Sequence, residues 1–144
     1  MKKILVPLDG SGFAEEVLPH AEELARSEGA EILLVRVPVI PTSVFVSQDP
    51  TLMTLAVNDT FREAATYIDH EAAKLNQEGL RATGITPSSG MIAETILAAA
   101  DETHADVIVM STHARTGLQR LLRGSVADQI VHKTHIPVVL VHPN

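Results

Sequence analysis

The 144-residue sequence contains no cysteine, and this absence excludes disulfides, thiolate metal ligands and a cysteine nucleophile. Tryptophan is also absent and aromatic residues make up only 3%, so Val, Ile, Leu and Ala must build the core, as in buried parallel sheets. No apolar run approaches the roughly 18 residues that a membrane span needs. Pro7 and Asp9 interrupt the short apolar stretch after Lys3 too early for a signal peptide. We therefore expect a soluble, cytoplasmic protein.

Basic residues are scarce as well, with 11 Lys and Arg against 18 Asp and Glu and a formal net charge of −7. A surface of this sign repels phosphate backbones and anionic lipids, so we expect neither nucleic acid nor a membrane as partner. At this length, with 45% hydrophobic residues, the chain can bury one core. We expect a single domain over residues 1–144.

Short β-branched runs alternate with amphipathic helical patterns along the chain. Strands are predicted at Lys3–Leu8, Glu31–Val37, Arg81–Thr86, Asp106–Met110 and Pro137–Val141, and helices at Gly12–Glu28, Asp59–Gln77, Ile92–Glu102 and Ser125–His132. This alternation is typical of βαβ crossovers. We predict an α/β fold with a doubly wound, five-stranded parallel sheet, helices on both faces and strand order 3-2-1-4-5.

Residues Pro38–Thr54 interrupt this alternation, because three prolines stand among apolar residues. We expect a loop here. Its apolar content fits a long connection packed on the surface, and also fits a lid or a subunit contact.

Several well-known site patterns are missing. Gly10-Ser11-Gly12 begins a dinucleotide fingerprint, but Glu15 occupies its third glycine position and Val37-Pro38 stands where the ribose-binding acid would be. The chain has no Gly-Lys pair for a P-loop and no nucleophile elbow, and its seven histidines show no metal-site spacing. Asp9, Ser11 and His113 could meet as a hydrolytic triad, which is the least favoured hypothesis.

The stretch from Asp106 to Ser125 is the best candidate for a binding site. An apolar strand leads into a loop with Arg115, Arg120 and Arg123, and Gly124-Ser125 then opens the last helix. The free N–H groups of a helix N-terminus, here those of Val126 and Ala127, favour an anion, and phosphate is the commonest one. A solvated basic helix face with an ordinary serine cap is the alternative interpretation.

Which residues lie opposite this loop depends on the place of the first strand in the sheet. If it lies between the second and fourth strands, Pro7, Asp9 and Ser11 approach Met110–Arg115, although about a hundred residues separate them. Such a meeting of distant segments is what a pocket requires.

The chain resembles the universal stress protein family over its whole length. The likeness lies in V-P-L-D-G-S at residues 6–11, a strand ending in Arg36-Val37, D-V-I-V-M-S-T-H-A-R-T-G, L-L-R-G-S-V-A and a final P-V-V-L-V. The resemblance implies a five-stranded α/β sandwich and a homodimer. One branch of the family binds ATP through G-x-x-G, nine residues and G-[ST], and another branch lacks this pattern and binds no nucleotide.

In this chain the pattern aligns as Ser111-Thr112-His113-Ala114, nine residues, then Gly124-Ser125. The spacing and the final pair are kept, whereas Ser111 and Ala114 replace glycines. If either position needs a positive φ, the loop is strained by about 1–2 kcal/mol.

The resemblance also implies site residues for ATP or a related adenine nucleotide, with or without Mg²⁺. The loop after the first strand and the end of the second strand would contact the adenine end. The loop after the fourth strand would contact the ribose and phosphates, and the start of the last helix would contact the phosphate tail. In that order the residues are Pro7, Asp9 and Val37; Met110, Ser111, His113, Ala114 and Arg115; Gly124, Ser125 and Val126, with Ser11 as a further candidate contact of the nucleotide. Asp9 would repel a polyphosphate, so the nucleoside end suits it better. No general base or complete metal site is evident, so any ATP hydrolysis should be slow.

Pro137–Val141 should be an edge strand, since Pro137 is tolerated at a first position and a bare apolar edge invites pairing. The family forms dimers in this way, and the alternative is a strand shielded by His142–Asn144. The leading hypothesis is thus a dimeric adenine-nucleotide-binding protein of stress response or signalling. A nucleotide-free protein-interaction module is the alternative.

Overall fold

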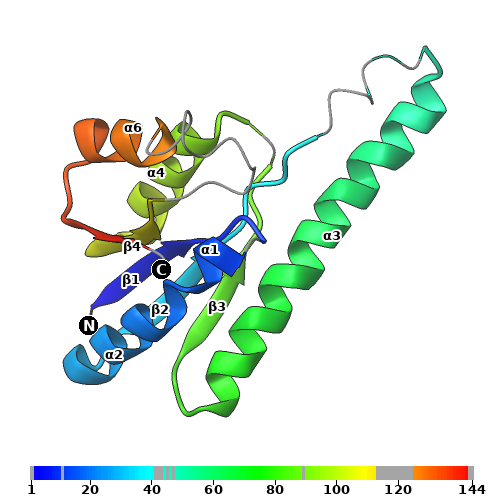
Figure 1. The fold of residues 1–144 in the computed structure, drawn as a ribbon. Helices are drawn as coiled ribbons and strands as arrows, with labels where there is room; N and C mark the ends of the chain where they lie inside the picture. Colours follow the sequence, from blue (N-terminus) through cyan, green and yellow to red (C-terminus); the bar gives the residue numbers. More distant parts are fainter. Residues whose placement is uncertain are drawn as a thin grey trace.

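A computed structural model describes residues 2–10, 12–40, 44, 46, 48–88, 90–112 and 125–142, with the backbone alone for residues 13, 14 and 125. Five parallel strands form one sheet of order β3-β2-β1-β4-β5 (Figure 1). The strands are β1 (Lys3–Pro7), β2 (Glu31–Val35), β3 (Ala82–Ile85), β4 (Val107–Ser111) and β5 (Val138–Val141). The predicted fold class and strand order are confirmed.

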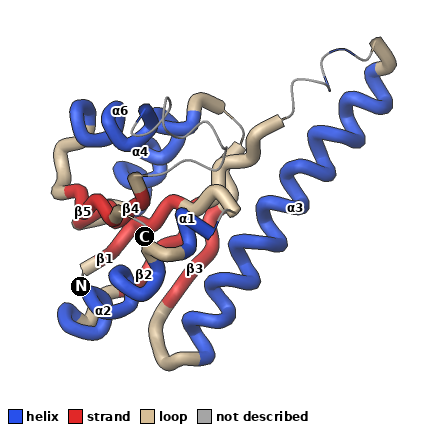
Figure 2. The backbone as a smooth tube through the Cα atoms, viewed as in Figure 1, coloured by secondary structure: helices blue, strands red, loops and turns tan. Residues whose placement is uncertain are grey.

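Helices cover both faces of the sheet. They are α1 (Gly12–Glu15), α2 (Leu18–Glu28), α3 (Pro50–Gln77), α4 (Ile92–Thr103) and α6 (Ser125–Lys133). Alternate residues of β1 point to opposite faces: Ile4 packs in a core with α2 and α3, and Leu5 packs in a second core with α4 and α6. Figure 2 shows β5 at one margin of the sheet and β3 at the other, beside α3.

The first predicted helix is interrupted in the structure. The pattern predicted one helix over Gly12–Glu28, but α1 ends at Glu15 and α2 begins at Leu18, with Pro19 in its first turn. Proline has no N–H to donate back to the preceding turn, so it favours a new helix start there. The predicted stop at Gly29 is confirmed, because Gly29 adopts the left-handed conformation at φ 66°.

The loop predicted over Pro38–Thr54 is wrong in its last part. Helix α3 begins at Pro50, nine residues before the predicted start at Asp59. Asp49 caps this start, since its carboxylate accepts the Thr51 N–H at 2.9 Å, and Pro50 suits the first helical position.

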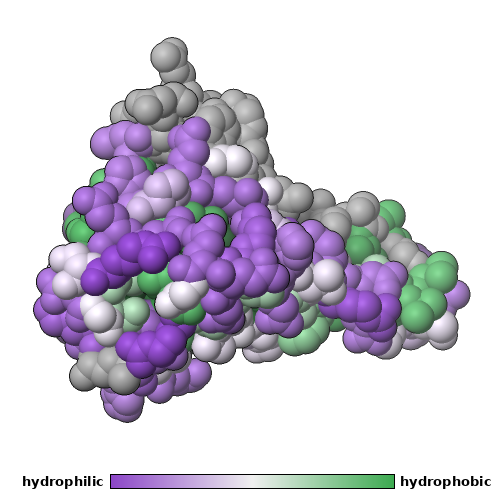
Figure 3. Space-filling model, turned by 90° about the horizontal axis from the view of Figure 1, so that it is seen from below, coloured by the Kyte–Doolittle hydropathy of each residue, from purple (hydrophilic) through white to green (hydrophobic). Residues whose placement is uncertain are grey.

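The two halves of α3 lie in different surroundings. The buried residues of the helix, Ala64, Ile68, Glu71, Ala72 and Leu75, all belong to its second half. The first half projects beyond the sheet (Figure 1), and Leu52 and Leu55 there are 56% and 53% exposed. Figure 3 shows apolar surface near the tip of this arm.

Candidate functional site

The carboxyl ends of β1 and β4 lie side by side at one edge of the sheet. Ile4 pairs with Val107 and Leu5 with Ile108 in parallel register, so Pro7 and Ser111 end their strands at the same edge. Strand β1 pairs with β2 on its other side. The strand order therefore reverses direction between β1 and β4. Ligands of open α/β sheets bind in the crevice at such a point.

The described part of the predicted site gathers at this edge. Met110 and Ser111 are buried at the end of β4, Pro7 and Asp9 are half-buried at and after the end of β1, and Val37 is buried two residues after β2. Ser11, His113, Ala114, Arg115 and Gly124 lie outside the described residues.

The described part of helix α6 runs from Ser125 to Lys133, within the region where the sequence predicted the last helix. Val126 in its first turn is half-buried, while Ala127 and Ile130 are buried in the core shared with α4. The apolar face of α6 therefore anchors the helix.

Ser111 occupies ordinary extended backbone. It is the last residue of β4, and the only non-glycine residue with positive φ among the described residues is His104. A serine in place of glycine therefore causes no backbone strain at this position.

Thr112 ties the start of the following loop to the end of β5. Its N–H donates to the Val141 carbonyl at 3.0 Å, and its Oγ1 lies 3.0 Å from His142 Nδ1. The loop after β4 thus starts from a fixed position on the neighbouring strand.

On the other side of β1, a buried cation holds the loop between β1 and α1. Arg36 directly follows β2 and is only 5% exposed. Its Nη2 donates to the two carboxylate oxygens of Glu63 at 3.2 and 3.4 Å, and its Cζ lies 4.7 Å from the centre of the Tyr67 ring. The carboxylate and the ring face compensate for part of the lost hydration of the guanidinium.

Gly10 packs directly against this guanidinium. Its φ is +86°, and a Cβ placed on it would lie 2.6 Å from Arg36 Nη1 and 3.1 Å from Arg36 Cζ. Both the backbone conformation and the close approach require glycine here. Gly10 itself is exposed, so the loop presents one side to solvent while Arg36 supports the other.

Tyr67 connects this cluster to α1. Its hydroxyl donates to Glu15 Oε2 at 2.7 Å. Burial, together with this hydrogen bond and the nearby Glu15 and Glu71 carboxylates, raises the pKa of Tyr67 far above its usual range. The hydroxyl therefore stays protonated at physiological pH. We refer to Gly10, Glu15, Arg36, Glu63 and Tyr67 together as the Arg36 cluster.

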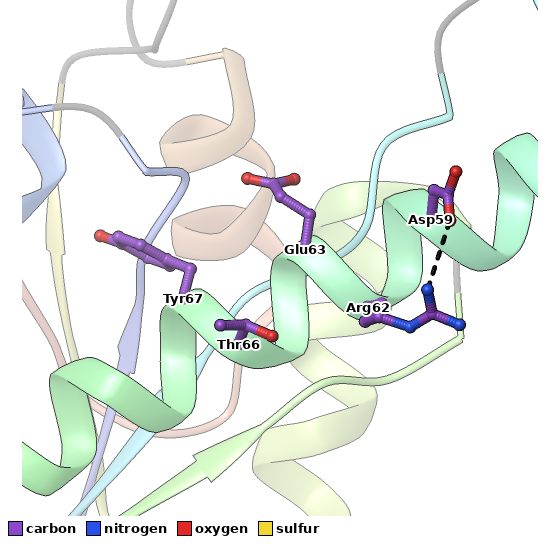
Figure 4. Close-up of a pocket in the computed structure, with 5 residues that line it drawn as sticks. All are labelled: Asp59, Arg62, Glu63, Thr66 and Tyr67. Atoms are coloured by element: carbon purple, nitrogen blue, oxygen red, sulfur yellow. Dashed lines mark hydrogen bonds and ion pairs between the residues drawn. The ribbon is translucent and has the colours of Figure 1, made fainter.

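A shallow depression of about 520 Å³ adjoins the cluster on α3. It is lined by Asp59, Arg62, Glu63, Thr66 and Tyr67. Figure 4 shows Glu63 and Tyr67 projecting from the same side of the helix and Arg62 paired with Asp59. None of the predicted site residues that the structure describes lines this depression.

The sequence prediction did not include the Arg36 cluster. Its signal was a lone charge inside the apolar run Glu31–Val37, because a buried arginine needs a partner. Within the described ranges, no three His, Asp or Glu side chains are close enough together to hold a metal ion. No described helix is both long and apolar enough to span a bilayer.

The sequence profile of the universal stress protein family matches residues 1–142. The chain belongs to the universal stress protein family. It is 31% identical to universal stress protein MJ0531 of Methanocaldococcus jannaschii over 97% of this chain and 81% of that protein. A solved structure of MJ0577 from the same organism is 27% identical, covers 99% of this chain and 96% of that chain, and superposes with a TM-score of 0.85.

A universal stress protein from Archaeoglobus fulgidus, solved in complex with dAMP, shares the fold at a TM-score of 0.61. It is 22% identical, with 97% of each chain covered. At this identity the likeness concerns the fold alone.

Proposed function

We propose that this universal stress protein binds ATP or a related adenine nucleotide at the carboxyl ends of β1 and β4. The observation that supports the proposal is the reversal of strand order beside β1, because the carboxyl ends of β1 and β4 lie at the same edge of the sheet there. A relative of the same fold is known with dAMP.

Each end of the nucleotide has its own set of residues in this proposal. Pro7, Asp9 and Val37 contact the adenine end; Met110, Ser111, His113, Ala114 and Arg115 contact the ribose and phosphates; Gly124, Ser125 and Val126 contact the phosphate tail; and Ser11 is a further candidate contact. The first amides of α6 and the arginines before it supply positive charge. Any Mg²⁺ would be held mainly by the phosphates.

The proposed biological role is sensing or signalling in the cytoplasm during stress, by one domain over residues 1–144. We expect any ATP hydrolysis to be slow, because the sequence offers no evident general base and no complete metal site. Nucleotide occupancy, rather than turnover, would then carry the signal.

Calorimetric titration with ATP and AMP, and mass spectrometry of small molecules that copurify, test the proposal. Gly124→Val should abolish binding, because a branched side chain would crowd the amides at the start of α6. Gly12→Ala is the matched control, since a Cβ at Gly12 meets nothing within 4 Å. A wild-type protein with neither copurified nucleotide nor affinity for ATP or AMP would refute the proposal.

A nucleotide-free interaction module is the second candidate, favoured by Ser111 and Ala114 in place of the glycines of the nucleotide-binding branch. Ser111→Gly with Ala114→Gly separates the two candidates. If the chain binds no nucleotide because of these residues, the double variant should gain binding. If the wild type already binds, affinity should change by less than about tenfold, since Ser111 has ordinary backbone.

We further propose a homodimer paired through Pro137–Val141. Beta-5 is an edge strand, and Val139 and Leu140 are each 42% exposed. An apolar edge strand is a template for pairing about a two-fold axis. Light scattering should give a dimer mass for the wild type and a monomer mass for Val139→Lys. A wild type that stays monomeric at micromolar concentration would overturn the dimer.

A further inference from the structure

The Arg36 cluster joins segments that are distant in sequence around a loop of the proposed site. Arg36 and Glu63 are 27 residues apart, and Tyr67 and Glu15 are 52 apart. The cluster therefore connects the end of β2, the middle of α3 and helix α1 with Gly10, the residue after Asp9. None of these side chains belongs to the predicted nucleotide contacts.

We propose that Arg36 is a positioning residue that holds Asp9 and Gly10 in place for the nucleoside end of the nucleotide. The inference rests on the proposed function and deepens it, since it says that a buried ion pair keeps one side of the binding site rigid. Gly10 is exposed toward solvent, while a Cβ on it would lie 2.6 Å from Arg36 Nη1. The guanidinium therefore fixes how far this loop can move inward.

The guanidinium is itself held from two directions. Glu63 accepts two hydrogen bonds from Nη2, and the Tyr67 ring lies 4.7 Å from Cζ. The Tyr67 ring is in turn fixed through its hydroxyl by Glu15. A group with few accessible positions is a firm support, and pre-organised loops lose less entropy when a ligand binds.

Lysine cannot reproduce this arrangement. Its ammonium is a compact point charge without a planar face, so it cannot pack flat beside Gly10 while reaching both Glu63 and Tyr67. The geometry thus requires arginine at position 36 and glycine at position 10 together.

The test compares Arg36→Met and Arg36→Lys with Arg62→Met, a matched control whose arginine side chain is 76% exposed and forms a surface ion pair with Asp59. Affinities for ATP and AMP are measured by calorimetry, and the backbone order parameters of Asp9 and Gly10 by NMR relaxation. Arg36→Met should weaken both nucleotides by the same factor, about tenfold or more, because the nucleoside end is common to both. Arg36→Lys should bind both nucleotides more tightly than Arg36→Met but more weakly than the wild type. The affinities of Arg62→Met should stay within about twofold of the wild type.

Backbone order distinguishes positioning from a general loss of stability. In Arg36→Met, the order parameters of Asp9 and Gly10 should fall below about 0.6, as in flexible backbone, while those of β1 and β2 stay at about 0.85. If Arg36→Met does not fold, Glu63→Gln replaces it, because the Glu63 side chain is 61% exposed. This variant should show the same pattern with a loss of about two- to fivefold.

A folded Arg36→Met that binds both nucleotides like the wild type, or that leaves the order parameters of Asp9 and Gly10 unchanged, overturns the inference. Order parameters that fall equally in β1, β2 and the loop also overturn it, since Arg36 would then act only on overall stability. A wild type that binds no nucleotide overturns the proposed function instead. In that case the order parameters alone still decide whether Arg36 positions the loop.

Discussion

The two halves of α3 have similar composition but different surroundings. Both contain apolar residues at helical spacing, yet Ile68 in the second half is fully buried against the sheet and Leu55 in the first half is 53% exposed. Helix formation needs a costly nucleus and then extends at little expense. The packed half can therefore supply the nucleus, while Asp49 and Pro50 end the extension at the tip. The comparison shows that apolar periodicity predicts a helix but not whether that helix is covered.

The contacts of α3 with Arg36 lie where the two halves meet. Glu63 directly precedes Ala64, the first buried residue of the helix, and both Glu63 and Tyr67 contact Arg36. The projecting half lies beyond this point. Four changes would break or sharpen this contrast.

The largest effect should come from Ile68→Ala. Ile68 is 0% exposed in the core with α2, so truncation leaves a cavity and should lower the free energy of unfolding by about 2–5 kcal/mol. Leu55→Ala, the matched change in the projecting half, should alter it by less than about 0.5 kcal/mol. Urea unfolding followed by circular dichroism measures both. Equal losses in the two variants would show that the projecting half is covered in solution.

Gly84→Ala should have the next largest effect, because β3 approaches the packed half of α3 closely. A Cβ on Gly84 would lie 3.1 Å from Ile68 Cγ2 and 3.2 Å from the Ile68 carbonyl carbon. The backbone cannot move away easily, so we expect a loss of about 1–3 kcal/mol in the same unfolding assay. Gly12→Ala, at the start of α1, should be close to neutral because a Cβ there meets nothing. A neutral Gly84→Ala would mean that α3 and β3 are packed less tightly than the structure has them.

Alkaline pH should test the junction through Tyr67. Burial and the Glu15 hydrogen bond raise its pKa in the folded state, with Glu71 adding to the shift and Arg36 opposing it. The neutral hydroxyl therefore contributes stability that is fully present below about pH 10, the usual tyrosine pKa, and is lost as pH rises above it.

The wild type should lose stability above pH 10 more steeply than Tyr67→Phe, by at most about 1.4 kcal/mol per pH unit. Urea unfolding at pH 9, 10 and 11 compares the two proteins. Parallel curves would show that the Tyr67 hydroxyl ionises as freely in the folded protein as in the unfolded chain.

The smallest global effect should come from Asp49→Ala at the tip. Loss of the cap should weaken the first turn of α3 by about 1 kcal/mol, because the Thr51 N–H loses its acceptor. Amide exchange of residues 51–54 should rise while the free energy of unfolding stays within about 0.5 kcal/mol, since this end opens independently. Asp59→Ala is the control on the same helix. A large drop in global stability would contradict independent opening.

The pattern of short apolar strands and amphipathic helices was sufficient to predict a parallel sheet with helices on both faces, whereas the strand order was a further hypothesis, which the structure confirms. The five strands were placed within about two residues, because buried strands need continuous Val, Ile and Leu. The start of α3 was missed, although Asp49 followed by Pro50 is a typical start signal. The prolines at 38 and 41 made the whole stretch resemble a loop.

The candidate site divides in the same way. The approach of β1 to β4 followed from the predicted strand order, and the pairing of the two strands confirms it. The backbone of Ser111 is ordinary extended strand. Only the structure shows this, because the strand β4 includes Ser111 as its last residue. Whether the predicted contacts bind a nucleotide stays a prediction.

The sequence by itself determined the fold class and the first and last residues of several elements, because periodicity and capping act between neighbours in the chain. Its motifs also indicated the family. Only the tertiary structure decided that Gly10, Arg36, Glu63 and Tyr67 meet, and that one half of α3 is covered while the other is not. These contacts join segments tens of residues apart, and such segments approach one another only after the sheet has formed. The identity of a buried arginine's partners is therefore settled by packing rather than by spacing.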